Sequence, residues 1–341
     1  MSDSVQLMAD IGRLAAIAAA VYGLTRLLAH PRNPWNVLDV PNARSLHSVP
    51  VPRTGGLAIL AGLALACILF GPHGSRQDIV AGGALVGIAL VSWRDDRASL
   101  PPATRLAAQF AAAAVTVVWG GVRWTGALLP GVPLALPSVV RDAGSVVYLT
   151  WCMNLYNFMD GMDGLAGGMA VFGFGTLAAL GARAGAVPFA LTGGAISAAA
   201  FGFTVSNYPP ARLFMGDAGS VPLGFLFGVM TLVASRGVAP LWVGILIFSP
   251  FCVDASVTLI RRLWRGENPA QAHREHYYQR LVMGGLGSAR VVTLEYGLMG
   301  LCAVSAWWAA IGSRATQWVI IAVWACAYAA LAMAIERWQG G

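Results

Sequence analysis

Lysine is absent from this 341-residue sequence, and charged residues of any kind are scarce. They make up 11% of the chain, whereas an average soluble domain carries about a quarter. So few charges could not cover a globular surface, so lipid must solvate most of the chain. The net charge of +7 comes from arginine alone, whose planar guanidinium stays protonated and suits phosphate. Codon bias would produce the same arginine-only pattern.

Other absences remove further classes of function. The five cysteines lie in apolar runs without CxxC spacing, which indicates core residues and neither disulfides nor metal ligands. No GxxxxGK[ST] motif is present, which excludes the usual ATPase. No soluble basic platform exists for nucleic acid. The N-terminal region has no basic segment followed by a cleavage site, so the first apolar stretch is expected to remain as a spanning helix.

Apolar runs of about 20 residues, the length that crosses a bilayer, dominate the chain. They predict an all-α, polytopic transmembrane helix bundle in a single domain, with about eleven spans or, if the weakest fails, ten. The predicted spans are 8–29, 54–71, 78–93, 103–120, 142–158, 163–182, 186–205, 219–236, 238–260, 289–311 and 315–335.

Arginines are concentrated in alternate loops, and this bias orients the predicted bundle. The positive-inside rule places the arginine-rich loops in the cytoplasm, the N-terminus in the periplasm and the C-terminus in the cytoplasm. The expected location is the bacterial inner membrane. The cytoplasmic loops with candidate chemistry fall near residues 30–53, 94–105, 154–167, 206–220 and 261–290.

Five aspartates fall at the cytoplasmic breaks between apolar runs. Asp95 and Asp96 are adjacent, Asp160 and Asp163 are in MDGMDG, and Asp217 is in MGDAGS. Singly, each motif fits a solvated loop, a glycine turn or a helix N-cap. Together, carboxylates this close to hydrocarbon indicate a site for a hard cation such as Mg²⁺. Asp160 and Asp163 would share a face if the break is helical.

Basic residues complete the cytoplasmic face. The segment AHREHYYQRL carries His273, Arg274, His276 and Arg280, which predict a phosphate contact, although a plain basic loop or zinc would also use these residue types. The earlier loop places Arg44, His47 and Arg53 among proline and glycine, a pattern typical of a shaped anion loop. Carboxylates, a metal ion and arginines are the recurring equipment of phosphoryl transfer.

Five segments of the chain resemble the polyprenyl-phosphate N-acetylhexosamine-1-phosphate transferases. They are WRDDR, NLYNFMDGMDGLAGG, PPARLFMGDAGS, HREHYYQRL and DVPNARSLHSVPVPRTGG. The similarity runs from about residue 39 to 281, in order. It implies an all-helical membrane enzyme that uses Mg²⁺, with Mn²⁺ as an alternative. Such enzymes transfer a sugar-1-phosphate from a UDP-N-acetylhexosamine to undecaprenyl phosphate and release UMP.

The resemblance also implies roles for individual positions. Asp217 would be the principal metal ligand, with Asp160 beside it, and Asp95 and Asp96 would hold or deprotonate the lipid phosphate. The remaining residues would order or bind the substrates: Asp163, Asn154 and Asn157 around the nucleotide and metal, Asn207 and Phe214 at the uridine, His273, Arg274 and His276 at pyrophosphate or sugar, and Arg44, His47, Arg53, Arg212 and Arg280 at anionic groups.

HREH followed by YYQRL resembles the subgroup that initiates O-antigen and other surface glycans, more than the peptidoglycan phospho-MurNAc-pentapeptide translocase. The donor sugar, and the choice between direct attack and a phospho-aspartate route, stay open. An anionic-lipid transporter is the alternative from another class, although its ionisable groups should lie near the membrane midplane.

Two further features are expected to be structural. Asp254, inside an apolar run, is predicted to pair with a neighbouring helix, and Glu295 is treated in the same way. The spacings Gly164/Gly168 and Gly224/Gly228 predict close helix packing, and such faces also leave a homodimer open.

Overall fold

The structure, a computed structural model, describes residues 3–30, 32–33, 37–41, 46, 49–71, 74–132, 136–268 and 273–340. These residues are mostly helical, as expected. Their helices are α1 (Asp3–Leu28), α2 (Gly55–Phe70), α3 (Arg76–Ala98), α4 (Pro102–Val118), α5 (Ser138–Phe158), α6 (Leu165–Arg183), α7 (Val187–Asn207), α8 (Asp217–Ala234), α9 (Leu241–Ile247), α10 (Ser249–Trp264), α11 (Tyr277–Leu281), α12 (Ser288–Ile311) and α13 (Arg314–Gly340), with a π-helical turn at Val282–Leu286.

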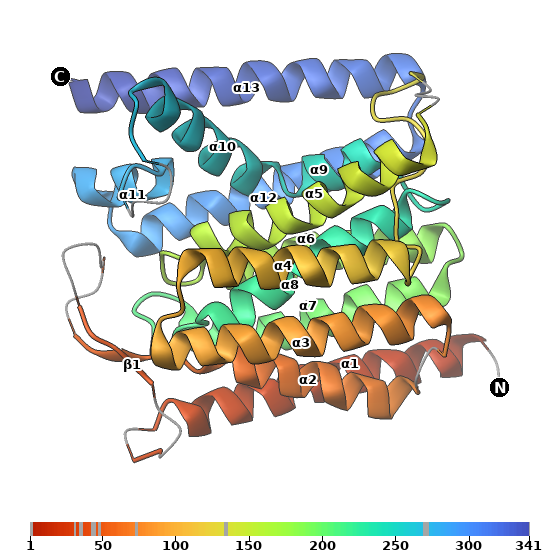
Figure 1. The fold of residues 1–341 in the computed structure, drawn as a ribbon, viewed down its shortest axis with the longest axis horizontal. Coiled ribbons are helices and arrows are strands. Elements are labelled where there is room, and N and C mark those ends of the chain that lie inside the picture. The colour runs from red at the N-terminus through yellow and green to blue at the C-terminus, as the bar shows by residue number, and fades with distance from the viewer. Residues whose placement is uncertain are drawn as a thin grey trace.

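Each predicted span coincides with one of these helices or, for 238–260, with the pair α9 and α10. Among the described residues, α1, α6, α7, α8, α12 and α13 are long and apolar enough to cross a membrane. The pair α9–α10 is a seventh candidate, bent by 81°. The other four predicted spans are the shorter α2 and α4 and the charge-bearing α3 and α5. The long helices lie side by side, with the two termini at opposite ends of the bundle (Figure 1).

Helix α8 occupies the centre of the bundle, with 83% of its residues buried. It packs against α3 and α5, and its glycines permit the close approach predicted from their spacing. A Cβ on Gly224 would lie 2.6 Å from the carbonyl oxygen of Cys152, and one on Gly228 would lie 2.8 Å from Leu149. Phe227 of α8 packs its ring against those of Phe174 and Phe248, which continues the core beside this helix.

A two-stranded antiparallel sheet, β1 (Leu38–Asp39) and β2 (Val51–Pro52), lies at one end of the bundle (Figure 1). The segment that precedes α8 is fastened to it, because Phe214 N donates to Pro52 O at 2.7 Å. Gly55 N in turn donates to Phe214 O at 2.9 Å, which ties the start of α2 to the same segment. These bonds fix the loop that delivers Asp217 to the first position of α8.

The last helix, α13, runs along one side of the bundle (Figure 1, top). None of its apolar window is buried. Its hydroxyl contact to the core is Tyr328 Oη with Ser249 Oγ, at 2.6 Å. Near its C-terminal end, Glu336 forms an ion pair with Arg261 of α10. Helix α13 therefore touches the bundle lightly but reaches the segment that follows α10.

Candidate active site

A cavity of about 440 Å³ lies where α3, α5 and α8 meet α4, α10 and the segment 273–279. Three of the five predicted carboxylates, those of Asp95, Asp160 and Asp217, line it. Four further residues from the sequence interpretation also line the cavity: Asn154, Asn157, His273 and His276. Apolar residues of α3, α4, α5, α8 and α10 contribute to the wall as well.

Asp217 begins α8, directly after Gly216, whose φ is +71°. A side chain in that position would be strained, and a Cβ there would lie 2.7 Å from the carbonyl oxygen of Arg53. The Asp217 carboxylate accepts a hydrogen bond from Asn157 Nδ2 at 2.8 Å and lies 3.7 Å from Arg105 Nη1. The sequence therefore uses glycine to turn the chain and an asparagine from α5 to orient the carboxylate.

Asp95 and Asp96 are neighbours in sequence, but their carboxylates point to different surroundings. Asp95 lines the cavity, where Oδ1 accepts from Leu100 N at 2.6 Å and Oδ2 pairs with Arg105 at 3.2 Å. Asp96 is 4% exposed, and its two oxygens accept from the backbone N–H groups of Asp217 and Ala218 at 3.0 and 2.9 Å. Asp96 therefore fastens α3 to the N-terminus of α8 and does not line the cavity.

Asp160 and Asp163 also separate, because the break between α5 and α6 is a turn and not a continuous helix. Asp160 faces the cavity, whereas Asp163 accepts a hydrogen bond from Ala211 N at 2.9 Å. Burial raises the pKa of Asp160 well above its ordinary value of 3.8, and the carboxylate of Asp217 is the neighbouring charge that raises it most. Two carboxylates thus share one poorly solvated space, an arrangement that a bound cation would relieve.

The predicted uridine contacts lie outside the cavity lining. Asn207 is 4% exposed, accepts from Gly164 N at 2.8 Å and donates to Leu213 O at 2.8 Å, so it braces two loops against each other. Phe214 is held through its backbone by Pro52 and Gly55. Asn154 does line the cavity and donates to Gln109 Oε1 at 2.6 Å.

The histidines of the segment 273–279 lie together on the cavity wall, with ring centroids 4.9 Å apart. Burial, together with the neighbouring His276 and Arg262, lowers the pKa of His273 from 6.5 to about 4, so His273 is neutral at physiological pH. Zinc was one alternative for this pair. Among the described residues, no three His, Cys, Asp or Glu side chains form a ready-made metal site.

The predicted arginine contacts are dispersed. Arg53 donates to the backbone carbonyl of Asp96, and Arg212 is exposed on the loop before α8. Arg274 and Arg280 line a different cavity, with Arg261, Arg265, Thr258, Glu275 and Glu336. Arg44 and His47 fall outside the described residues.

Arg105 is the functional candidate that sequence reasoning missed. In the sequence it is one of many arginines in the loops predicted to be cytoplasmic, but in the structure its guanidinium lies between the carboxylates of Asp95 and Asp217. Its position in the first turn of α4, ten residues after Asp95, was the available signal. Tyr278 and Gln279 also line the cavity, and the Tyr278 hydroxyl is buried without a hydrogen-bond partner among the described residues.

The donor set of this cavity fits a hard divalent cation. Mg²⁺ is bound in proteins by one or two carboxylates, with water and substrate phosphates in its other positions. Asp160 and Asp217 supply two carboxylates whose charges perturb each other, and no thiolate lines the cavity.

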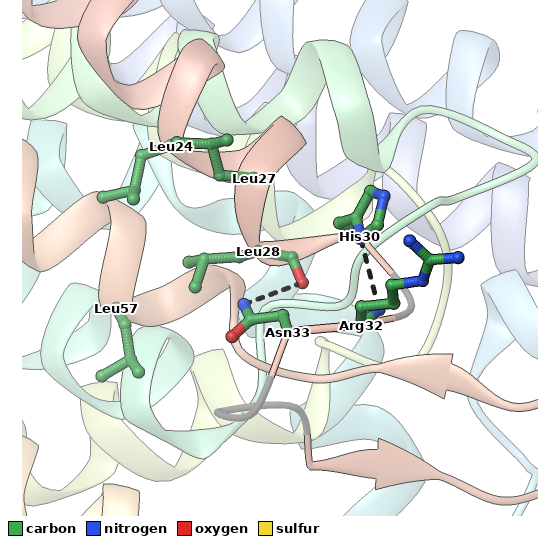
Figure 2. Close-up of a pocket in the computed structure, with 7 residues that line it drawn as sticks. All are labelled: Leu24, Leu27, Leu28, His30, Arg32, Asn33 and Leu57. Atoms are coloured by element: carbon green, nitrogen blue, oxygen red, sulfur yellow. Dashed lines mark hydrogen bonds between the residues drawn. The ribbon is translucent and has the colours of Figure 1, made fainter.

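A second cavity lies at the C-terminal end of α1, away from the carboxylates (Figure 2). Leu24, Leu27, Leu28 and Leu57 form its apolar wall, while His30, Arg32 and Asn33 form its polar edge. Asn33 Nδ2 donates to Leu28 O at 3.4 Å. This second cavity shares no lining residue with the cavity that Asp95, Asp160 and Asp217 line, called the acidic cavity below. Its leucine wall is of the kind that packs against hydrocarbon.

The fold and the cavity define a multi-pass membrane protein with a carboxylate-lined site at the ends of its helices. The model of glycosyl transferase family 4 matches residues 79–235. The chain is 30% identical to decaprenyl-phosphate N-acetylglucosaminephosphotransferase from Mycolicibacterium smegmatis, over 88% of this chain and 81% of the relative. It is 26% identical to a probable undecaprenyl-phosphate N-acetylglucosaminyl 1-phosphate transferase from Bacillus subtilis, over 79% and 76% of the two chains.

A third similar protein is undecaprenyl-phosphate alpha-N-acetylglucosaminyl 1-phosphate transferase from Escherichia coli, which is 26% identical over 88% of this chain and 84% of its own. The chain therefore belongs to glycosyl transferase family 4, among the polyprenyl-phosphate N-acetylhexosamine-1-phosphate transferases. The resemblance identified from five sequence segments is confirmed.

Proposed function

We propose that this protein transfers an N-acetylhexosamine-1-phosphate from a UDP-sugar to undecaprenyl phosphate, yielding UMP and a lipid-linked pyrophosphoryl sugar. The proposed donor sugar is GlcNAc or a related N-acetylhexosamine, with 6-deoxy sugars included in that set. The reaction takes place at the cytoplasmic face of the bacterial inner membrane, with eleven spans placing the N-terminus in the periplasm. Its product initiates an O-antigen or another surface polysaccharide.

One observation carries this proposal: a single cavity collects Asp95, Asp160 and Asp217 from three separate helix ends, with Arg105 between two of them. A cluster of carboxylates beside the Arg105 guanidinium suits a site in which a metal ion, held by the carboxylates, and the guanidinium both bind phosphates. The names of the three relatives supply the class of substrate, a polyprenyl phosphate and an N-acetylglucosamine phosphate.

In the reaction, an oxygen of the lipid phosphate attacks the β-phosphorus of the UDP-sugar. The bond between that phosphorus and the oxygen bridging to the α-phosphate breaks, and UMP leaves with the electron pair. The bond between C1 of the sugar and its oxygen stays intact, so the anomeric configuration is kept. The lipid phosphomonoester is largely dianionic at neutral pH, because its second pKa is about 6, so orientation matters more than proton removal.

The residues of the cavity divide this work. Asp217 and Asp160 would hold Mg²⁺, which would neutralise charge on the phosphates. Asn157 orients Asp217, and Arg105 offers a guanidinium to a phosphate oxygen at the mouth of the cavity. His276 and Tyr278 line the same space and would contact the pyrophosphate or the sugar.

The direct test is transfer by the purified protein in lipid nanodiscs supplied with Mg²⁺ and undecaprenyl phosphate. UDP-GlcNAc, UDP-GalNAc and a UDP-linked 6-deoxy relative would be compared by UMP release and by radiolabel in the lipid product. Decaprenyl phosphate should be tested beside the undecaprenyl acceptor, because the names of the relatives include both lipids. Failure to release UMP with every donor would contradict the proposal.

Asp217→Asn tests the catalytic role of this residue with little structural change, since the amide oxygen can still accept the hydrogen bond from Asn157 Nδ2 while the charge is lost. We expect it to retain the wild-type melting temperature and lose nearly all turnover. Retained turnover in this variant would contradict the proposed role of Asp217 as a metal ligand. Replacing Mg²⁺ by Mn²⁺ should support transfer, and a chelator should abolish it.

A further inference from the structure

The buried carboxylate of Asp254 fastens the segment 273–281 to the bundle, beside the ion pairs of Glu275 with Arg262 and Arg265. Asp254 of α10 is 6% exposed and accepts hydrogen bonds from the segment at both oxygens. Its Oδ1 lies 2.9 Å from Tyr277 N and 3.1 Å from His276 Nδ1, and its Oδ2 lies 3.2 Å from Tyr278 N. Thr258 Oγ1 donates to Oδ1 at 3.3 Å from within α10.

Capping of α11 explains only part of this arrangement. The backbone N–H groups of Tyr277 and Tyr278 bond to different oxygens of Asp254, so an asparagine, with one acceptor oxygen, would keep one of these bonds and weaken the cap without abolishing it. The contact with the imidazole is different, because an ionised carboxylate only accepts hydrogen bonds. His276 Nδ1 must therefore carry a proton whenever Asp254 is ionised.

His276 lines the acidic cavity, whereas Asp254 does not. With Nδ1 occupied by Asp254, Nε2 is the ring nitrogen left for the cavity. The same carboxylate also holds the backbone of Tyr278, whose ring stacks on the imidazole at 5.7 Å with an interplanar angle of 14°. One side chain thus orients two groups of the cavity wall.

We propose that Asp254 is a positioning residue for His276: it keeps the ring proton on Nδ1 and directs Nε2 toward the phosphates of the substrate. In the neutral ring Nε2 accepts a hydrogen bond, and after it gains a proton it donates one to a phosphate oxygen, next to the carboxylate that stabilises the imidazolium. This inference rests on the proposed transfer reaction for its consequence, but its geometry can be measured without any substrate.

The first experiment is NMR of the full-length protein labelled with ¹⁵N only in its histidines, of which the sequence has five. The spectrum of His276→Gln assigns the signal of His276. We expect wild-type His276, when neutral, to be protonated at Nδ1, and Asp254→Asn to lose this preference because an amide NH₂ can donate to Nδ1. A wild-type ring protonated at Nε2, or an unchanged tautomer in Asp254→Asn, would overturn the inference.

The second experiment is a double-mutant cycle on transfer activity. Loss of a carboxylate that orients a functional histidine typically lowers activity by about 10- to 100-fold. We expect Asp254→Asn to lower kcat to this extent, and to have little further effect when His276→Gln is already present. Effects that multiply in the double variant would show that Asp254 does not act through His276.

Asp142→Asn is the matched control, because it also removes a helical carboxylate, at an ion pair with Arg123 outside the acidic cavity. It should change neither the His276 signal nor kcat. If the wild-type protein releases no UMP, the proposed function fails while the tautomer of His276 still decides the geometry. If transfer occurs but the tautomer is wrong, only the inference about Asp254 fails.

Discussion

Replacing Asp96 by asparagine separates a positioning role from a direct role in the reaction. Both of its oxygens accept backbone N–H groups at the N-terminus of α8, and an asparagine retains only one acceptor oxygen. A hydrogen bond to a charged group contributes about 1.5–3 kcal/mol, and a negative charge at a helix N-terminus about 0.3–1 kcal/mol. Burial opposes these gains and raises the pKa of Asp96 to about 6, so Asp96→Asn should lower the free energy of unfolding by only about 1–2 kcal/mol.

Turnover should fall as well, because the lost bond lies at the backbone of Asp217. A displacement of about 1 Å at a reacting group can lower the rate by about 100-fold. Thermal unfolding in nanodiscs would report the first effect, and UMP release would report the second. Asp78→Asn is the control on the same helix: its carboxylate is bonded to Ser75 in an exposed position, so stability should change by less than about 0.5 kcal/mol.

Asp96→Asn should lose stability and turnover together. A variant that melts at the wild-type temperature yet cannot turn over would refute it, since Asp96 would then act on a substrate. Asp217→Asn provides the opposite pattern for comparison, with turnover lost and the fold retained.

Three further outcomes follow from the same geometry. Arg105→Gln should lower the free energy of unfolding by less than about 1 kcal/mol, because the side chain is 38% exposed. Isothermal titration calorimetry should show tighter Mg²⁺ binding, because two carboxylates lose their counter-charge, and weaker binding of the UDP-sugar. The raised pKa of Asp160 means that metal-free protein loses stability as the pH rises above about 3.8, and that Mg²⁺ binding releases a proton and tightens with increasing pH. Asp160→Asn should reduce both effects in calorimetry at several pH values, and the part that remains should come from Asp217, whose pKa burial raises to about 7. Gly216→Ala should lower the melting temperature and turnover, because its φ is +71° and a Cβ would meet Arg53, whereas Gly237→Ala, with no atom within 4 Å, should be neutral or slightly stabilising.

Helices were predictable from the sequence because about 20 consecutive apolar residues are a signal that needs no knowledge of the partner helices. The position of the break near Asp160 followed from the interruption of two such runs. What happens within the break did not follow, since the i, i+3 expectation required a helical connection and the chain instead turns between residues 159 and 164. Asp163 consequently bonds to Ala211, while Asp160 enters the cavity.

The site itself was predictable as a set of residue types on one set of helix ends, but not as a set of contacts. Asp95 and Asp96 are indistinguishable in sequence, and only the N-terminus of α8 separates their roles. Asp254 was expected to pair with a neighbouring helix; it bonds the backbone of the first residues of α11, but its side-chain partner, His276, lies 22 residues away in the loop before that helix. Arg105 was hidden by the general surplus of arginine in the same loops.

The unburied apolar surface of α13 makes the surrounding acyl chains a structural component of this protein. A helix that buries almost nothing against its own bundle gains its stability from the medium, so the choice of detergent or lipid will decide whether it stays docked. Because Glu336 of that helix is paired with Arg261, near the C-terminal end of α10, a change of lipid reaches the edge of the segment that carries His276.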